Sequence, residues 1–480
     1  MSTYIYRSAK ELANLIKNGE VTSTEIVNEH LAQIKKHNPS LHAVVILLEN
    51  EALEAASMCD REAKAGIFRG PLHGVPMTIK EQYWLKGTKS TINSNRLKTW
   101  VASENAVIVN RLENAGAIIM GKSNVAKELL DYQTNGDIYS ECKNPYHLDH
   151  TPGGSSGGAA AALASGMTPI ELGWDFGGSI RVPSNFCGLY GLKPTEYTIP
   201  RHGNVPKPKS AKSYIFHMAT GGPMARTPED LELLWNIIKG PHKNDPMVPP
   251  IDWNSSKRKK LADYKIAWVD GWPGFENSLE TQKLIKDFIK LIDNKGGNTT
   301  NVLPKSDLHE RSLSVYRKLS FQMILQDVPW FIKPLIMGSL KRGFLKGMKE
   351  IHWKFWDSLL DYSQLMGQRA NIIKEWEEFF EEFDLLICPS GNGPAFPRCK
   401  IGTPISFSGK TMKYLEYVWP YNACFNASGH PSMSLPLGIG DGGLPVGVQI
   451  VGPYWSEINM LSFAKLISEF TSGFVKPEGY

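Results

Sequence analysis

Two glycine-rich turns carry the serines of this sequence that are best suited to chemistry. Residues 153–158 read GGSSGG and contain Ser155, while residues 177–181 read GGSIR and contain Ser179. Glycine beside a serine allows turns that other residues cannot adopt and lets a substrate approach the hydroxyl closely. Ser155 and Ser179 are therefore candidates for a nucleophile and a partner hydroxyl.

The second turn could also stabilise negative charge. Successive N–H groups of Phe176, Gly177, Gly178 and Ser179 could converge into an oxyanion hole, in which one donor is typically worth about 3 kcal/mol. The alternative for both turns is structural, with glycines that only connect a strand to a packed helix. Either turn alone leaves both interpretations open.

Two widespread motifs match locally but lack the right surroundings. Residues 116–123 fit the GxxxxGK[ST] phosphate loop, but their variable residues are Ala-Ile-Ile-Met, which are typical of a strand rather than of a phosphate-binding turn. Residues 153–157 fit the G-x-S-x-G nucleophile elbow, yet the polar segment 147–152 precedes them where a buried strand is required. We expect neither nucleotide binding nor an α/β-hydrolase elbow.

Together with a third segment, these turns resemble the amidase signature family. Residues 74–80 read GVPMTIK, similar to the family's lysine motif, and the separation of 24 residues between Ser155 and Ser179 is similar to the family's spacing. Other segments that look like the family's extend over nearly the whole chain: 116–123, 186–194, 426–432 and 443–452. The resemblance implies an α/β fold, with a mixed central β-sheet sandwiched between helical layers.

The resemblance also implies a Ser-Ser-Lys triad. Ser179 would be the nucleophile that forms the acyl-enzyme, Ser155 a bridging serine held by a cis peptide after Gly154, and Lys80 the base. A hydroxyl both donates and accepts hydrogen bonds, so Ser155 could pass a proton from Ser179 to Lys80. At an ordinary lysine pKa, deprotonation at pH 7 would cost about 4.6 kcal/mol. Because burial can lower a lysine pKa by about 3–5 units, we expect a buried Lys80.

Further residues are expected around this triad. By the resemblance, Asp175 and Arg181 look like orienting residues, and Ser156 could lend a hydrogen bond. The candidates for contact with substrate are Trp174, Phe176 and, more weakly, Tyr132. The chain departs from the family at Glu81-Gln82, where a pair such as Asp-Asn usually follows the lysine.

The elements that must position these residues follow from periodicity and capping. S/T-x-x-E capping boxes at residues 8–11 and 22–25 predict two N-terminal helices. Short apolar runs alternate with helical segments over residues 74–204, and residues 264–304 return to a strand–helix–strand pattern. This alternation is typical of an α/β sheet covered on both faces.

We expect a single amidase domain over residues 1–480, in which residues 307–383 form a variable helical insertion that could act as a lid. This segment is rich in aromatic residues, namely Trp330, Phe331, Phe344, Trp353, Phe355, Trp356, Trp376, Phe379 and Phe380. They could line an acyl channel, or they could simply pack the insertion on the sheet. Lysines and arginines interleaved at 328–349 would also allow contact with an anionic membrane, although Pro329 and Pro334 interrupt a clean amphipathic helix.

Composition limits the remaining possibilities. A net charge of +5 over 480 residues is too weak to indicate a nucleic-acid partner. The six cysteines form no CxxC pair and show no metal-ligand spacing with histidine, so we expect neither a metal nor a cofactor. There is no signal-peptide pattern and no run of about 18 apolar residues. A reduced, cytoplasmic enzyme is the natural expectation.

The resemblance implies an amidase that transfers an acyl group to water and releases ammonia or an amine. We expect a small-molecule amide substrate with a hydrophobic acyl or aromatic group. One alternative is the glutaminase (A-type) subunit of a glutamyl-tRNA amidotransferase, which would use the same triad to feed ammonia to another chain. A non-catalytic binding protein on the same scaffold is the alternative from another class. A homodimer is compatible with the sequence, which does not determine the oligomeric state.

Overall fold

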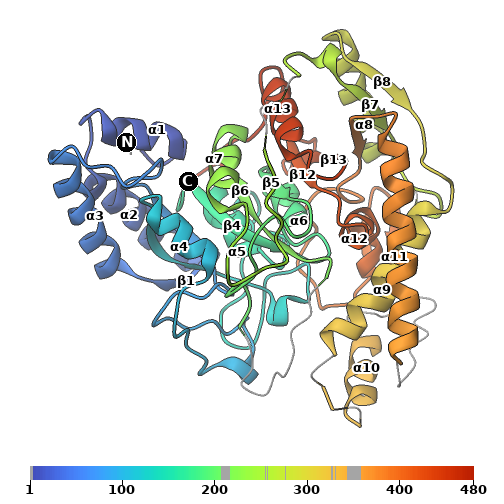
Figure 1. The fold of residues 1–480 in the computed structure, drawn as a ribbon, viewed down its shortest axis with the longest axis horizontal. Helices are drawn as coiled ribbons and strands as arrows, with labels where there is room; N and C mark the ends of the chain where they lie inside the picture. The colour runs from blue at the N-terminus through green and yellow to red at the C-terminus, as the bar shows by residue number, and fades with distance from the viewer. Residues whose placement is uncertain are drawn as a thin grey trace.

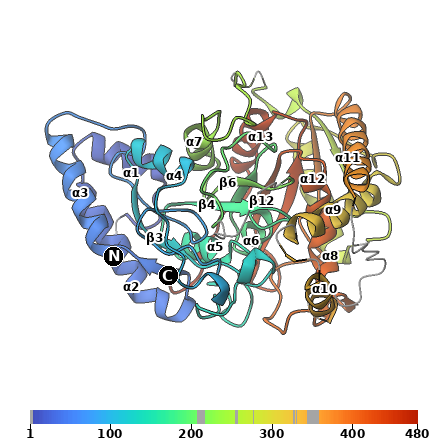
Figure 2. The same cartoon turned by 60° about the horizontal axis from the view of Figure 1, so that its bottom comes forward.

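The computed structural model describes residues 4–206, 217–253, 256, 258–275, 277–325, 328–329, 331–342 and 358–480. It has an α/β fold in which a mixed β-sheet runs through the centre and helices lie on both sides (Figure 1). The N-terminal helices lie at one end of the molecule, and the helices within residues 308–380 lie at the other end in both views (Figures 1 and 2). The expected architecture is confirmed.

The central sheet has eight strands in the order β4-β6-β5-β12-β13-β9-β7-β8. Pairing is antiparallel from β4 to β9 and parallel among β9, β7 and β8. The strands span Ile170–Asp175 (β4), Tyr190–Lys193 (β5), Thr220–Ala225 (β6), Lys265–Trp268 (β7), Asn298–Asn301 (β8), Leu385–Cys388 (β9), Ser432–Ile439 (β12) and Pro445–Val451 (β13). The strand β4, which leads to Ser179, is buried along its whole length.

A separate three-stranded sheet, in the order β1-β3-β2, carries the lysine motif. Its strands are Val44–Leu47 (β1), Pro76–Lys80 (β2) and Ile118–Ser123 (β3). The parallel pairing of β2 with β3 sets Lys80 opposite Ser123. All of β3 is buried, so Ala-Ile-Ile-Met does belong to a strand and its approach, and the match to a phosphate loop has no structural basis.

The N-terminal helices confirm both capping boxes. In α1 and α2, the first turn is closed reciprocally by Ser8 with Glu11 and by Thr22 with Glu25. The helices in this half are Ala9–Lys17 (α1), Ser23–Leu41 (α2), Glu49–Lys64 (α3) and Val107–Asn114 (α4), with 3₁₀ turns at Asn95–Leu97 and Lys127–Leu129.

Two short helices follow the serine turns and are wholly buried. They are Gly157–Ala164 (α5) and Arg181–Phe186 (α6). Every residue of α5 is glycine, alanine or leucine, and alanine forms helices readily while its small side chain lets neighbouring elements approach closely. The sequence therefore places a helix without a polar face directly behind the GGSSGG turn.

The remaining helices follow β6 in the chain. These are Pro228–Ile238 (α7), Leu279–Asn294 (α8), Leu308–Ile324 (α9), Lys333–Arg342 (α10), Leu359–Phe380 (α11), Trp419–Ala427 (α12) and Glu457–Ser468 (α13). A hairpin, Ile405–Phe407 (β10) with Lys410–Met412 (β11), and 3₁₀ turns at Leu261–Asp263 and Tyr414–Tyr417 complete the elements. Helix α9 packs against α11 and α12. No helix in the described part of the chain combines the length and hydropathy needed to cross a bilayer.

The aromatic residues predicted to form a channel have different environments. Trp376 and Phe380 are buried in an apolar cluster and support the packing alternative, whereas Phe331 is 62% exposed. Trp330, Phe344, Trp353, Phe355 and Trp356 lie outside the described residues, as do residues 343–349 of the segment considered for membrane contact.

Candidate active site

Ser179 lies in the turn between the end of β4 and the start of α6, and a buried carboxylate shapes that turn. Asp175, the last residue of β4, accepts hydrogen bonds from the N–H groups of Gly178 at 2.9 Å and Ile180 at 3.1 Å. It also pairs with Arg181, which contacts it through Nε at 3.0 Å and Nη2 at 2.9 Å. The backbone around Ser179 is thus wound about one carboxylate.

Asp175 stays ionised although it is fully buried. Burial would raise the pKa of Asp175, but the charge of Arg181 and hydrogen bonds from Arg181 and Asn426 hold it well below its usual range. The expectation that Asp175 and Arg181 orient the turn agrees with these contacts.

Arg181 connects the turn to two distant segments of the chain. Its Nη1 donates to Gln449 Oε1 at 2.6 Å and its Nη2 to Asn426 Oδ1 at 2.6 Å. Asn426 in turn donates to Asp175 Oδ1 at 2.9 Å. Both residues lie in segments that resembled the family, 426–432 and 443–452, but the sequence did not indicate that they meet at Arg181. Only the tertiary structure brings them together.

Lys80 and Ser155 meet beside this turn. The Gly154–Ser155 peptide bond is cis, as the resemblance implied. Lys80 projects from the end of β2, is completely buried, and its Nζ donates to Ser155 Oγ at 2.9 Å and to the carbonyl oxygen of Trp174 at 3.4 Å. Burial lowers the pKa of Lys80 to about 7, although the negative charges of Asp175 and Glu171 act to raise it. A neutral amine near pH 7 is what a base at this position requires.

Ser156 and Trp174 contribute through the backbone of β4. The N–H of Trp174 donates weakly to Ser156 Oγ at 3.5 Å, which ties the GGSSGG turn to the strand. The Trp174 side chain is 3% exposed, and Trp174 is not among the residues that line the cavity at Ser179. Its predicted contact with substrate is not supported at this cavity, because β4 is buried on both faces.

The predicted set of oxyanion donors needs one correction. The N–H of Gly178 is held by Asp175 Oδ1, so it is not available to a substrate oxygen. In the described part of the chain, the N–H groups of Gly177 and Ser179 make no hydrogen bond to another protein group. The sequence could not reveal this, because four consecutive amides look equivalent until the strand end places Asp175 beneath one of them.

A largely apolar cavity opens at Ser179, which is 7% exposed. Its lining consists of Leu129, Leu130, Asp131, Tyr132, Phe176, Gly177, Ser179, Tyr316, Arg317, Ser320, Phe321, Ile324, Leu415 and Trp419. Of the predicted pocket residues, Phe176 and Tyr132 are therefore at the cavity. Tyr132 also donates from its hydroxyl to the Gly177 carbonyl at 2.7 Å, which braces the turn around Ser179.

Helix α9 supplies the cavity wall that the sequence did not identify. Tyr316, Phe321 and Ile324 lie on this helix, and Trp419 faces Tyr316 with ring centroids 5.6 Å apart. The aromatic composition of residues 307–383 was a usable signal, but it did not distinguish the residues that line the cavity from those that pack α11.

Glu81 and Gln82, which depart from the family pattern, hold neighbouring loops. The Glu81 carboxylate accepts from the N–H groups of Thr91 at 2.5 Å and Ile92 at 3.0 Å. Gln82 Nε2 donates to the carbonyl oxygen of Asn204 at 2.7 Å. Both residues are buried and neither lines the cavity at Ser179.

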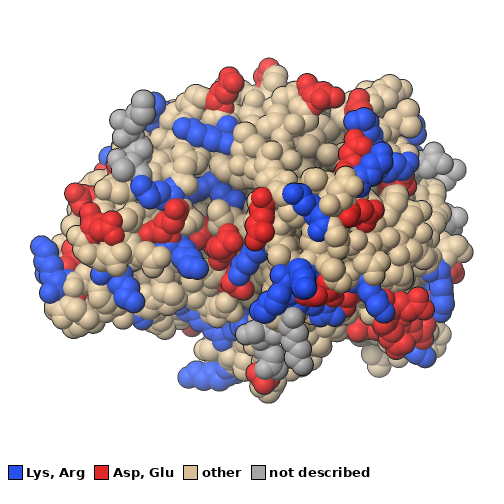
Figure 3. Space-filling model, turned by 90° about the horizontal axis from the view of Figure 1, so that it is seen from above, with Lys and Arg blue, Asp and Glu red and all other residues tan. Residues whose placement is uncertain are grey.

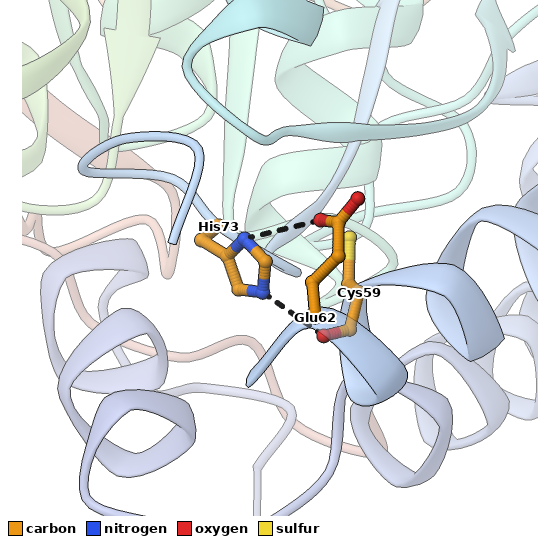
Figure 4. Close-up of side chains that lie close together, drawn as sticks. All are labelled: Cys59, Glu62 and His73. Atoms are coloured by element: carbon orange, nitrogen blue, oxygen red, sulfur yellow. Dashed lines mark hydrogen bonds and ion pairs between the residues drawn. The ribbon is translucent and has the colours of Figure 1, made fainter. Parts of the chain in front are cut away.

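Cys59, Glu62 and His73 come close together between α3 and the turn that precedes β2 (Figure 4), and their ligand-type atoms lie within 4.8 Å of one another. His73 Nε2 contacts the Cys59 carbonyl at 3.1 Å, and the Arg69 N–H donates to His73 Nδ1 at 3.2 Å. The Arg69 guanidinium binds Glu62 through two bonds of 2.7 Å. These interactions engage both imidazole nitrogens and the carboxylate, and give the cluster a structural role in anchoring residues 69–73 to α3.

The comparisons with known proteins agree with this geometry. The family model described as Amidase matches residues 25–461. The chain is 29% identical to the A-type subunit of glutamyl-tRNA(Gln) amidotransferase from Chromohalobacter salexigens, with 98% of each chain covered. A bacterial aryl acylamidase of the amidase signature family superposes with a TM-score of 0.81 at 25% identity, covering all of both chains.

A second solved structure shows the same fold at greater sequence distance. The A-type subunit of glutamyl-tRNA(Gln) amidotransferase from Thermotoga maritima has a TM-score of 0.76 at 22% identity, covering 100% of this chain and 99% of the other. A match over most of the sequence, a shared fold and a buried lysine hydrogen-bonded to a serine after a cis peptide lead to one conclusion. This chain belongs to the amidase family of C–N hydrolases.

Proposed function

We propose that this enzyme hydrolyses carboxylic-acid amides that carry a hydrophobic acyl or aromatic group, through an acyl-enzyme on Ser179. The observation that carries the proposal is the cavity at Ser179. Apart from Asp131 and Arg317, the polar groups of its lining are Tyr and Ser hydroxyls, the Trp419 indole N–H and backbone groups. Phe176, Phe321 and Ile324 give it an apolar wall. Sites of this kind bind apolar groups and use few polar groups for orientation.

The triad would act as a proton path. Ser179 Oγ attacks the amide carbonyl carbon while its proton passes to Ser155 and the Ser155 proton to neutral Lys80. The protonated Lys80 returns a proton through Ser155 to the leaving nitrogen, the C–N bond breaks, and ammonia or an amine departs. Water then attacks the ester by the same path and releases the carboxylic acid. The 2.9 Å contact between Lys80 and Ser155 supports this sequence of steps.

The charged residues at the cavity are already engaged by protein groups. Asp131 accepts from the Tyr414 hydroxyl at 2.5 Å and from the Tyr132 N–H at 2.7 Å. Arg317 is paired with Glu310. Free glutamine would bring an ammonium and a carboxylate that each need a partner, since an unpaired buried charge is costly. An apolar substrate avoids that cost.

The glutaminase subunit of a glutamyl-tRNA amidotransferase is the second candidate, and the names of the sequence relatives favour it over the first. The A-type subunit of Clostridium botulinum (strain Eklund 17B / Type B) is 31% identical over 95% of both chains. In that case the chain would act with partner subunits and deliver ammonia to them. The non-catalytic alternative has no support, because the chain belongs to a family of enzymes.

We propose that the ligand of this protein is a small-molecule amide. Basic and acidic side chains are interspersed on the face drawn in Figure 3. The six cysteines are unpaired, in keeping with a reducing, cytoplasmic setting. We propose residues 307–383 as the part of a single domain that shapes the acyl side of the cavity, with α9 as its wall.

A direct competition between substrates tests the proposal. The purified chain alone would be assayed for ammonia release from unbranched acyl amides of two to twelve carbons, from aromatic amides and from glutamine. Each methylene that enters the cavity should raise kcat/KM about fourfold, equivalent to about 0.8 kcal/mol, until the cavity is full. A flat series with glutamine hydrolysed best, and more so with a co-purified partner, would establish the glutaminase candidate instead.

A further inference from the structure

The hydroxyl group of Tyr316 lies against the nucleophile turn. A Cβ built on Gly177 would meet the Tyr316 hydroxyl oxygen at 2.5 Å and the Tyr132 hydroxyl oxygen at 3.6 Å. The two phenols thus approach the same face of Gly177, and any side chain there would displace them. The Tyr132 hydroxyl donates its hydrogen bond to the Gly177 carbonyl oxygen. Tyr316 does not, so the two hydroxyls have different tasks.

The hydrogen bonding of Tyr316 leaves its proton free for another molecule. Its ring lies against that of Trp419, with centroids 5.6 Å apart. No protein acceptor for its proton is found among the described residues. Burial raises the pKa of Tyr316 well above its usual value, so the hydroxyl keeps its proton at working pH. Tyr316 is 6% exposed, and it lines the cavity that Ser179 opens into.

The turn itself has one donor fewer than its sequence suggests. Asp175 holds the Gly178 N–H, which leaves fewer backbone amides for a substrate oxygen than a glycine turn would otherwise offer. We propose that the Tyr316 hydroxyl donates a hydrogen bond to the carbonyl oxygen of the substrate and to the oxyanion that forms from it, and that Trp419 positions this hydroxyl. The inference rests on the proposed function, because it assumes attack by Ser179.

This arrangement connects the helical segment 307–383 directly to the reaction. Tyr316 sits on α9, and its ring contacts Phe176 at 5.5 Å and Trp419 at 5.6 Å between centroids. These contacts fix the phenol from two sides before substrate arrives. A preorganised donor is worth more than a mobile one, because no reorganisation is needed when charge develops.

Tyr316→Phe removes the hydroxyl and keeps the ring. We expect kcat for amide hydrolysis to fall about 100-fold with KM changed less than about twofold, because the bond strengthens as charge forms. Phosphonylation of Ser179 by an aryl phosphonate should slow to a similar extent, since the phosphoryl oxygen occupies the same position. Trp419→Phe should produce a smaller loss of kcat, because the hydroxyl remains but the smaller ring packs less closely against the phenol.

Tyr417→Phe is the matched control. This buried tyrosine donates its hydroxyl to the Pro394 carbonyl at 2.8 Å and does not line the cavity. It should lose stability without a selective loss of kcat. Equal kinetic losses in the Tyr316 and Tyr417 variants, or an unchanged kcat in Tyr316→Phe, would overturn the inference.

Acyl length separates this inference from the substrate proposal. A bond to the carbonyl oxygen should cost the same factor for a two-carbon and a ten-carbon amide, and for glutamine if glutamine is a substrate. A uniform loss with a flat acyl series would keep the role of Tyr316 and reject the hydrophobic substrate. A loss that grows with acyl length would show that Tyr316 only packs against the acyl group, and would reject its role as a donor.

Discussion

The turn around Ser179 and the cavity wall on α9 face each other but are built in opposite ways. The backbone of the turn donates hydrogen bonds to Asp175. Arg181 in turn donates to Asn426 and Gln449, which lie in segments far from it in the chain. The wall presents apolar side chains such as Phe321 and Ile324, which pack against a hydrophobic cluster. Charge networks tolerate little change, whereas apolar surfaces can be repacked at modest cost.

This difference explains how the fold can keep one reaction while the preferred substrate changes. Removing one member of the buried network leaves the others with unpaired polar groups, so the turn resists variation. Exchanging one apolar wall residue for another changes mainly the shape of the cavity. Tyr316 is the exception, because it carries a polar group from the wall to the turn.

The largest effect should come from the turn and its proton path. We expect Ser179→Ala to lower kcat/KM by about 10⁴-fold or more, and Ser155→Ala and Lys80→Met to cause losses of similar size that do not add in a double variant. Steady-state kinetics and intact-mass analysis of a phosphonate adduct would test this. Ser156→Ala is the control and should lose much less. An adduct that survives in Ser179→Ala would mean that the nucleophile has been misassigned.

The next largest effect concerns the charge network. Asp175→Asn leaves the Arg181 guanidinium buried without its counter-ion, and should lower the free energy of unfolding by about 3–5 kcal/mol as well as lowering activity. Urea denaturation would measure the change. Asp287→Asn breaks an exposed ion pair with Lys283 and should be nearly silent. A similar response of both variants would remove the contrast between network and surface.

A smaller effect should appear in the pH profile. Because burial lowers the pKa of Lys80 to about 7 and the base must be neutral, kcat/KM should rise about tenfold from pH 6 to pH 8. The lowered pKa also means that the unfolded chain binds more protons between pH 7 and about 10.5, so the Lys80 contribution to stability rises over that interval. Loss of activity at pH 6 should thus precede any unfolding at acid pH.

A carboxyl group at the cavity, Asp131, titrates in the same range as Lys80, and the two effects must be separated. Burial raises the pKa of Asp131 to about 7, against hydrogen bonds from Tyr414 and two backbone amides. Asp131→Asn should retain the rise in activity between pH 6 and pH 8. Disappearance of the rise in this variant would assign it to Asp131 rather than to Lys80.

The smallest effect should come from the wall. Ile324→Ala should lower kcat/KM for long acyl amides by about fourfold for each substrate methylene that no longer packs against the wall, and leave acetamide unchanged. The acyl-length series repeated on the variant would measure it. Leu279→Ala, at a residue that is 76% exposed, provides the control. An equal reduction for all acyl lengths would show that the wall affects the turn and not the substrate alone.

The sequence by itself predicted the candidate reacting groups, because the motifs that carry them are local. Glycines beside Ser155 and Ser179, the motif that ends in Lys80 and the capping boxes of α1 and α2 each act over a few residues. The alternation of apolar runs and helical segments also predicted the α/β fold, since strands and helices each have a characteristic spacing of apolar residues.

Tertiary structure alone decided which of these groups are free to act. The engagement of the Gly178 amide by Asp175 depends on how β4 ends, and the meeting of Asn426 and Gln449 at Arg181 depends on strand order. The choice of Tyr316 and Phe321 over Trp376 and Phe380 as cavity residues depends on how α9 and α11 pack. The contacts of Arg181 join residues more than 200 positions apart, and no local pattern carries that information.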